Sequence, residues 1–253
     1  MMARIIAVMN QKGGVGKSTT CVNLTAALTE KGARALLCDF DPQANATSGM
    51  GLEKPEDGGV YGALIGEIPA CEAIAKTEFG DVLPSCKALA GAGIELVSLP
   101  RRELLLKDAL DSLRESYDFI FIDCPPSLEL LTLNALCAAD GILVPVQCEY
   151  YALEGLSDLM NIVRMVRRSL NPRLTLEGVL LTMYDSRTNL AQQVAEEVKH
   201  YFPGQVFTSV IPRNVRLSEA PSHGLPITAY DRSCKGSEAY LKLADELMRR
   251  ARR

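Results

Sequence analysis

Short apolar runs alternate with amphipathic stretches along the 253 residues of the chain. Each run is continuous and flanked by polar residues or glycine, a pattern typical of strands buried on both faces of a parallel sheet. Between the runs, apolar residues recur at helical spacing, as do Leu156, Leu159, Met160, Val163 and Val166. The alternation predicts a single α/β domain over residues 1–253, with a mostly parallel, twisted sheet flanked by helices on both faces.

The apolar runs and periodic stretches also give the approximate positions of the elements. Strands are predicted for residues 4–9, 34–40, 117–123, 141–147, 174–183 and 206–211. Helices are predicted for residues 18–30, 128–138, 152–168, a stretch that ends at His200, and 237–252. Residues 43–59 are rich in Gly, Asn and Pro and predict a loop, whereas residues 60–113 are mostly helical in pattern, with breaks at prolines.

Composition narrows the class of protein. The chain is 47% hydrophobic and 23% charged, which is typical of a globular protein. Its apolar runs are far shorter than the about 18 residues that span a bilayer and too short for the core of a signal peptide, so we expect a cytoplasmic protein. The eight cysteines form no C-x-x-C pair and mostly sit in apolar segments. They indicate packing in a reducing compartment rather than a metal site.

Charge is distributed unevenly along the chain. The formal net charge is −4, which by itself argues against a nucleic-acid partner. From residue 199 to the end, however, there are ten Lys or Arg and only five Asp or Glu. An acidic protein with a basic C-terminal part can carry a basic face, so the composition leaves DNA binding open.

A glycine-rich stretch, residues 11–20, follows the first predicted strand and leads into the first predicted helix. In this setting backbone N–H groups converge on a phosphate. Gly13, Gly14 and Gly16 allow the backbone to wrap closely around it, because no Cβ restricts their conformation. Lys17 is placed to reach the β- and γ-phosphates, and the Ser18 hydroxyl to bind Mg²⁺. The stretch predicts the phosphate-binding loop of a P-loop NTPase.

Acidic residues close two of the predicted strands. Asp39 and Asp41 end the second strand, where alternation places both side chains on one side. Asp123 ends a hydrophobic strand, which is the Walker B arrangement, with the acid near the Mg²⁺ shell. Open α/β sheets bind ligands at the carboxyl ends of their strands, so these acids suit placement of a metal and a water beside the loop.

The phosphate-binding loop departs from the usual pattern at one position. Gln11 stands where the first glycine is usual, and it is followed by a second lysine, Lys12. The sequence Lys-Gly-Gly-Val-Gly-Lys-Ser of residues 12–18 resembles the deviant Walker A motif of the ParA/MinD ATPases. Residues 39–49 and 122–127 are similar to that family's Walker A′ and Walker B stretches, and residues 145–155 and 211–221 resemble its chromosomal ParA (Soj) branch. Ala44 stands where Gly is common in the family.

The resemblance implies a role for each of the matching residues. Lys12 would reach across a nucleotide-sandwich dimer to the partner's phosphates, and Asp41 would orient the attacking water. Ser18 would bind Mg²⁺ directly, while Asp39 and Asp123 would hold its water shell. Pro212 and Asn214 would lie beside the adenine. The phosphates would be held by Gly13, Gly14, Val15, Gly16, Lys17, Ser18 and Thr19.

The function implied is that of a Mg²⁺- and ATP-dependent switch for partitioning chromosomes or plasmids. The ATP-bound homodimer would bind double-stranded DNA without sequence preference and associate with the nucleoid. The candidate DNA contacts are Arg187, Arg213, Arg216 and Lys199. Neither the phosphate loop nor the Walker B stretch contains an arginine that could act as an arginine finger, so we expect slow intrinsic ATP hydrolysis. A ParB/Spo0J-type centromere-binding protein would accelerate it and release the DNA.

Three alternative functions would use the same phosphate-binding loop. A MinD-like ATPase that cycles on membranes needs an amphipathic C-terminal anchor, but the apolar stripe from Tyr240 to Ala251 has no Trp or Phe and predicts a helix docked on the core. A reductase that carries a cluster needs paired cysteines, and only Cys124 and Cys137 lie in roughly the right part of the chain. A P-loop kinase would need an Arg-rich lid, which the sequence lacks. We therefore expect no membrane association.

Overall fold

A seven-stranded sheet forms the centre of the computed structural model, which describes residues 2–127, 129–149 and 152–251. The strand order is β3-β4-β2-β5-β1-β6-β7, and every neighbouring pair is parallel except β3 and β4. The predicted α/β fold with a mostly parallel sheet is thus confirmed. The strands are β1 (Arg4–Val8), β2 (Ala35–Asp39), β3 (Ala75–Thr77), β4 (Gly80–Leu83), β5 (Phe119–Asp123), β6 (Gly141–Gln147) and β7 (Thr175–Thr182).

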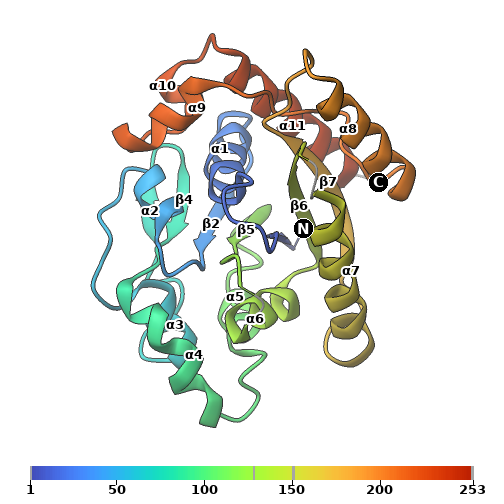
Figure 1. Ribbon diagram of the computed structural model, residues 1–253. Helices are drawn as coiled ribbons and strands as arrows, with labels where there is room; N and C mark the ends of the chain where they lie inside the picture. The colour runs from blue at the N-terminus through green and yellow to red at the C-terminus, as the bar shows by residue number, and fades with distance from the viewer. Residues whose placement is uncertain (1, 128, 150–151, 252–253) are drawn as a thin grey trace.

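Helices cover both faces of this sheet, and Figure 1 shows α8–α11 gathered at the top and α3–α6 at the bottom. The longer helices are α1 (Lys17–Glu30), α6 (Leu130–Ala138), α7 (Ala152–Ser169), α8 (Asn189–Tyr201) and α11 (Lys235–Ala251). The shorter ones are α2 (Asn45–Gly49), α3 (Gly59–Ile65), α4 (Ala92–Glu95), α5 (Leu105–Asp111), α9 (Val215–Glu219) and α10 (Ile227–Tyr230), with 3₁₀ turns η1 (Lys87–Gly91), η2 (Leu96–Ser98) and η3 (Ala220–His223).

Alternation along the strands divides the interior into two apolar layers. In β1, Ile5 and Ala7 belong to the apolar layer that also contains residues of α3 and α5–α8, whereas Ile6 and Val8 belong to the layer that contains residues of α1 and α9–α11. All four side chains are fully buried. A strand that buries both of its faces must be apolar at every position, which explains why the runs in the sequence are continuous rather than alternating.

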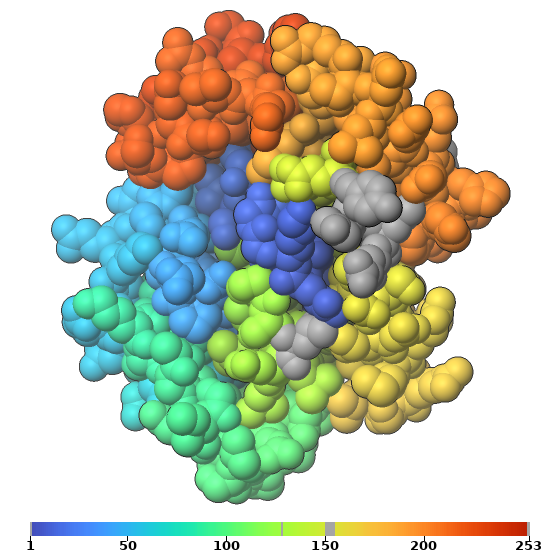
Figure 2. Space-filling model, viewed as in Figure 1, coloured from blue at the N-terminus to red at the C-terminus, as the bar shows by residue number. Residues whose placement is uncertain are grey.

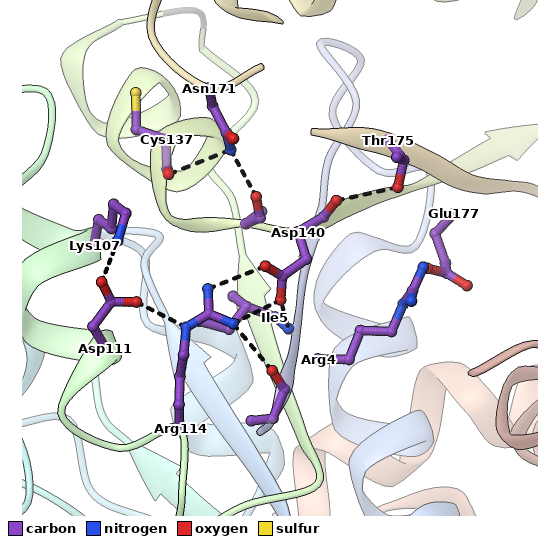
Figure 3. A network of polar contacts seen from close by, with 12 residues as sticks. Arg4, Ile5, Lys107, Asp111, Arg114, Cys137, Asp140, Asn171, Thr175 and Glu177 are labelled. Atoms are coloured by element: carbon purple, nitrogen blue, oxygen red, sulfur yellow. Dashed lines mark hydrogen bonds and ion pairs between the residues drawn. The ribbon is translucent and has the colours of Figure 1, made fainter. Parts of the chain in front are cut away.

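A polar network ties the amino ends of the central strands together (Figure 3). The Arg114 guanidinium donates to both carboxylate oxygens of Asp140, at 2.9 and 3.1 Å, and to the Ala3 carbonyl at 3.1 Å. Asp140 in turn accepts the backbone N–H of Ile5 at 2.8 Å. The Asn171 amide donates to carbonyls at the end of α6, among them that of Ala139 at 2.8 Å. These bonds satisfy backbone groups at helix and strand ends and so fix the end of the sheet opposite the predicted phosphate loop.

The predicted strand at residues 206–211 is wrong. The segment forms no continuous ladder with β7. One isolated bridge joins Val179 to Val206, the Ile211 N–H donates to the Leu181 carbonyl at 2.9 Å, and a second bridge joins Tyr184, beyond the end of β7, to Pro212. Between them, the Glu246 carboxylate of α11 accepts the N–H groups of Thr208 and Ser209 at 2.9 and 2.8 Å. A side chain that takes these donors replaces the ladder bonds of a strand. The cause is a contact 38 positions away in the chain, which the local apolar pattern cannot show.

The region of residues 60–113 is also less helical than predicted. The short antiparallel hairpin of β3 and β4 interrupts it, and the predicted loop at residues 43–59 contains the one-turn helix α2. Other predicted boundaries agree to within a few residues. Two predicted ends, Leu128 and Arg252, lie outside the described residues.

We expect Glu246→Gln to destabilise the protein in a pH-dependent way. Burial tends to raise the pKa of this carboxyl, but the N–H groups of Thr208 and Ser209 outweigh burial and lower it. Because the folded-state pKa lies below the unfolded value of about 4.3, ionised Glu246 stabilises the fold above that pH, and this contribution is lost as the pH falls through the folded-state pKa. Urea unfolding at pH 7 should show that the variant has lost about 1–2 kcal/mol of its free energy of unfolding.

The same unfolding measured near pH 3 should show little difference between Glu246→Gln and wild type. Glu238→Gln is the matched control, since Glu238 lies on the same helix and its side chain is 59% exposed. If Glu246→Gln lost the same free energy of unfolding at both pH values, the stabilisation would not come from the ionised Glu246 carboxylate.

The C-terminal helix α11 docks on the core, as predicted. Tyr240, Ala244 and Leu247 are fully buried, and the Tyr240 hydroxyl lies 3.3 Å from that of Thr20 in α1. Its apolar side is therefore occupied by the protein itself. None of the described helices is long and apolar enough to cross a membrane.

Candidate nucleotide-binding site

The glycine-rich loop connects the end of β1 to the start of α1 and leaves the first turn of that helix open. Gly14 and Gly16 adopt φ values of 74° and 91°, in the left-handed region where glycine is favoured. Gly16 precedes the first helical residue, and no side chain caps the helix. The free N–H groups of the first turn, together with the positive end of the helix dipole, therefore form a site for an anion.

Neighbouring strands hold the loop in place. The Thr182 hydroxyl at the end of β7 donates to the Val15 carbonyl at 2.9 Å, and the Asn10 amide donates to the Pro145 carbonyl in β6 at 2.7 Å. Figure 2 shows the dark-blue N-terminal residues reaching the surface in the middle of this face, between the light-blue residues, the orange C-terminal helices and the green and yellow residues below. The loop is thus rigidly supported and accessible.

A cavity of about 570 Å³ opens above the loop. The size is that of a site for a nucleotide-sized ligand. Six of the residues that were predicted to hold the phosphates line this cavity: Gly13, Gly14, Gly16, Lys17, Ser18 and Thr19. Val15 is fully buried beneath them. The Lys17 side chain is buried as well, and its ammonium donates to the Lys12 carbonyl at 3.3 Å. Glycine backbone, a helix start and a buried lysine in one cavity form a site for a polyphosphate.

Lys12 does not point into this cavity. Its ammonium pairs with the Glu149 carboxylate at 2.8 Å, and both side chains are nearly half exposed. The loop therefore directs one lysine inward and the other toward the surface.

Asp39 and Asp123 end adjacent strands and lie side by side. They are register partners in the pairing of β2 with β5, and both are fully buried. Burial raises the pKa of Asp39 to about 6, although hydrogen bonds from the Thr47 hydroxyl and backbone N–H oppose the shift. Burial and the charge of Asp39 raise the pKa of Asp123 well above its usual value, while Ser18 and Lys17 act in the opposite direction. Two buried carboxyls held this close favour a bound cation.

Asp123 also has an orphaned acceptor. Its Oδ2 atom is buried and has no hydrogen-bond partner among the described residues. The Ser18 hydroxyl lies near enough to affect its pKa. An unpartnered carboxylate oxygen beside a hydroxyl and a second acid fits a hard cation such as Mg²⁺ with part of its water shell.

Asp41 lines the cavity from the loop that follows β2. Its Oδ1 atom accepts the backbone N–H of Gln43 at 2.9 Å, and its backbone carbonyl accepts the Ser85 hydroxyl at 2.7 Å. The side chain is thereby held at the cavity wall with one carboxylate oxygen engaged. A carboxylate on this wall is able to orient a water, or to accept a proton from one, inside the cavity.

Comparison with known proteins agrees with this geometry. A family model described as an AAA domain matches residues 3–176. The sporulation initiation inhibitor protein Soj of Bacillus subtilis (strain 168) is 58% identical over 249 residues, which cover 97% of this chain and 98% of that protein. The chain belongs to the Soj/ParA family. The chromosome partitioning protein ParA of Myxococcus xanthus (strain DK1622) is 54% identical, over 98% of this chain and 89% of its own.

A solved structure resembles this member of the Soj/ParA family closely. It is the cobyrinic acid a,c-diamide synthase from Mycobacterium smegmatis with bound ATP analog and magnesium. Its TM-score is 0.88 at 39% sequence identity, with 98% of this chain and 94% of that chain covered.

One departure from the pattern of Soj/ParA proteins has a structural consequence. Ala44 adopts φ 51° and ψ 40°, the left-handed region that an L-residue with a Cβ disfavours. Glycine, common at this position in the family, adopts that conformation without strain. Replacing Ala44 with Gly is therefore compatible with the loop beside Asp41.

The far wall of the cavity differs from the prediction. Pro212 and Asn214 do not line it, and Asn214 instead caps α9 by accepting the Arg216 N–H at 2.8 Å. Their contact with adenine stays a prediction. Other residues that line the cavity, which sequence reasoning missed, include Asn23, Met183, Pro221 and Leu225. Pro221 closes one of the stretches that resemble the Soj branch, which is the only signal the sequence offered for it.

The arginines predicted to contact DNA lie beyond the carboxyl ends of the strands. Arg187 follows β7, is 85% exposed, and is held by Asp185 through Nη2 at 2.6 Å and Nε at 2.8 Å. Arg213 is exposed as well and lowers the pKa of Asp185, so these two arginines flank one carboxylate. The bridge between Tyr184 and Pro212 brings their segments together.

The other two candidates are placed differently. Arg216 on α9 is half exposed and pairs with Glu219 at 2.8 Å and with Asp231 at 3.5 Å. Lys199 is exposed near the last turn of α8, about 15 Å along that helix from the end that adjoins Arg187. The fold thus brings together Arg187 and Arg213, but not Lys199.

The cysteines considered for a cluster are buried in this chain. Cys124 and Cys137 are at most 2% exposed. Burial raises the pKa of the Cys137 thiol to about 11 and that of Cys124 still further. A cluster shared between two subunits needs thiols at the surface, so neither buried side chain is placed for it in this fold. No group of His, Cys, Asp or Glu in the described residues forms a ready-made metal cage.

Proposed function

We propose that this protein is an ATP-dependent partitioning switch, in which ATP binding, dimerisation and DNA retention are coupled. The observation that supports this most strongly is the cavity in which a buried lysine, a helix start and Asp41 converge beside two buried acids. The Soj/ParA relatives, which span nearly the whole chain, support the role in partitioning.

ATP would bind with its phosphates on the loop. The N–H groups from Gly13 to Thr19 and the Lys17 ammonium would hold the phosphate oxygens, and Ser18 would provide a metal ligand. Asp39 and Asp123 would hold the waters of that metal. The ATP analog and magnesium in the M. smegmatis structure support this proposal.

Hydrolysis would depend on position and on charge neutralisation. When bound, Mg²⁺ supplies positive charge that offsets the negative charge developing on the phosphate oxygens. Lys17 would add positive charge to the same oxygens, within a partly enclosed cavity where that charge is weakly screened. Asp41, fixed by Gln43, would orient a water for attack on the γ-phosphate. Among the described residues no arginine lines the cavity, so we propose slow turnover in the absence of a partner.

Lys12 would complete the site of a second subunit. It would exchange its partner Glu149 for the phosphates of the other protomer, because both side chains are at the surface and the ion pair is exposed. An exposed pair contributes at most about 1 kcal/mol, so it is readily replaced by a polyphosphate. ATP but not ADP would favour the dimer, since only ATP presents a γ-phosphate to both lysines.

DNA would bind to the dimer through its phosphates. Arg187, Arg213 and Arg216 supply the positive charge, with Lys199 further away. Arg187 is paired with Asp185, and Arg216 with Glu219. DNA phosphates would therefore compete with these two carboxylates for the arginines. A ParB-type partner would then stimulate hydrolysis and release the DNA. The docked α11 gives the membrane-cycling alternative no support in the described residues.

Charge reversal of Arg187 and Arg216 tests this proposal. The double variant Arg187→Glu/Arg216→Glu should lose ATP-dependent retention on random-sequence duplex DNA and should retain ATP hydrolysis. The dependence of log affinity on log salt should become about two units shallower, because about two phosphate contacts are lost. The measurement is fluorescence anisotropy over a salt series.

The control is Arg34→Glu, which breaks a comparable exposed pair with Asp118 at the amino end of β2. It should bind DNA as wild type does. If the double variant bound DNA with an unchanged salt dependence, these arginines would not be the DNA contacts.

A further inference from the structure

A second cavity, lined mainly by apolar side chains, lies on the face of the sheet covered by α6 and α7. It is a groove of about 760 Å³ between η2, α6 and α7, and Figure 1 shows these helices at the lower end of the molecule. Its walls include Val97 of η2, Leu133 of α6, and Met165 and Leu170 at the end of α7. None of its lining residues belongs to the nucleotide cavity. The groove is therefore a separate site that the chemistry of ATP does not use.

Large apolar side chains are exposed mainly around this groove. Of the nine that are exposed among the side chains the structure describes, Met165 at 63%, Val97 at 52% and Leu170 line the groove, and two more, Ile94 and Leu99, lie within three positions of Val97 in the chain. Ile94 stands one helical turn before Val97, so it extends the same wall. Soluble proteins seldom leave a contiguous apolar surface open unless a partner covers it.

The shape of the groove fits a helix. Its α7 wall runs from Ile162 to Leu170, which at 1.5 Å per residue is about 12 Å or two helical turns. A third helix packed between the α6 and α7 walls can place apolar side chains at positions i, i+3 or i+4, and i+7 into the groove. An extended chain would gain no sheet edge here, because the neighbouring elements are helical.

The charge beside the groove is positive and unbalanced. Residues 161–174 contain four arginines and no acid. Of these, Arg164 donates to Asn161, and no ion pair joins any of the four to a described residue. Arg168 lies three positions after Met165, and Arg164 one turn before Arg168, so both stand on the solvent side of the Met165 wall.

Few acids offset this charge at the groove itself. Among the described residues that line it, Glu103 is paired with Arg102, and only Glu129, just before α6, is left to favour a positive group. An amphipathic helix with carboxylates along one edge would match both the apolar side chains that line the groove and the arginines beside it. DNA would match the arginines but would leave the five apolar side chains in water.

We propose that this groove binds an acidic amphipathic helix of a partner protein. The apolar residues of that helix fill the space between Val97, Leu133 and Met165, and its carboxylates pair with the arginines of α7. The site is independent of the nucleotide cavity, so the proposal holds whether or not the chain acts as a partitioning ATPase.

Selection from a library of helical peptides tests the proposal. The library has leucines at i, i+3 and i+7 and random residues on the polar face, and binders are selected on the immobilised full chain. Acidic peptides should be enriched, and anisotropy should show that their affinity falls about tenfold in Met165→Asp and in Arg168→Glu. Both side chains are at the surface, so circular dichroism and ATP turnover of these variants should match wild type.

Leu190→Asp, which alters an exposed apolar residue on α8, is the matched control and should bind the peptides as wild type does. Failure to enrich any binder, enrichment of neutral or basic peptides, or binding that Met165→Asp leaves unchanged would overturn the proposal. Loss of duplex DNA binding in Arg168→Glu, without an effect on the peptides, would assign the arginines to DNA instead.

Discussion

Replacing Lys17 with alanine is expected to lower ATP hydrolysis about a thousandfold. The ammonium is buried at the base of the cavity and donates to the Lys12 carbonyl, so it is already directed toward the position of the phosphates. No other described lysine lines the cavity, and none can replace it. Because the charge acts in an enclosed site, its loss removes both phosphate binding and neutralisation of the charge that develops during hydrolysis.

Phosphate release and binding of a fluorescent ATP analogue measure the effect. Lys242→Ala is the control, since that lysine is 73% exposed on α11. The circular dichroism spectrum of Lys17→Ala should match that of wild type, so that the loss of hydrolysis reports the missing ammonium and not a change of fold. Hydrolysis within about tenfold of wild type would mean that Lys17 is not the phosphate ligand.

Replacing Asp41 with asparagine is expected to separate binding from turnover. Asparagine keeps an oxygen that can accept the Gln43 N–H, so the loop keeps its conformation while the negative charge is lost. A residue that orients or activates water contributes about 10² to 10⁴ in rate, so hydrolysis should fall at least a hundredfold. ATP affinity should change little, and the ATP-bound form should stay on DNA for longer.

Single-turnover hydrolysis and equilibrium binding of ATP separate these quantities. Asp57→Asn, which alters an exposed acid in the chain segment that follows, is the control. If Asp41→Asn hydrolysed ATP at the wild-type rate, the carboxylate would serve only to shape the turn at Gln43.

Local pattern was sufficient for the central part of the fold. The continuous apolar run of β1 and the glycines before Lys17 each specify their structure through neighbours within a few residues, and both were predicted correctly. The placement of Asp39 and Asp123 at the carboxyl edge of the sheet followed from the general rule that open α/β sheets bind ligands there, whereas their register as direct neighbours came from the structure. These features depend on chain direction and burial, which the sequence shows directly.

The incorrect predictions concern contacts between distant residues. The segment at 206–211 has the composition of a strand, but Glu246 on α11 takes two of its N–H groups. Two features about which the sequence made no prediction, the pairing of Lys12 with Glu149 and the cavity wall at Met183 and Leu225, also join positions that no local spacing connects. The hairpin of β3 and β4 was missed because strands of three and four residues are too short to show a period.

Binding of the wild-type protein to random-sequence duplex DNA with ATP, with ADP and without nucleotide tests the central claim most directly. Because ATP in the cavity is proposed to control a basic surface, the protein should bind DNA only when ATP is present. This binding should weaken steeply as the salt concentration increases. Binding that is the same in all three nucleotide states, or absent in all of them at low salt, would contradict the proposal that this Soj/ParA-family chain is an ATP-controlled DNA switch.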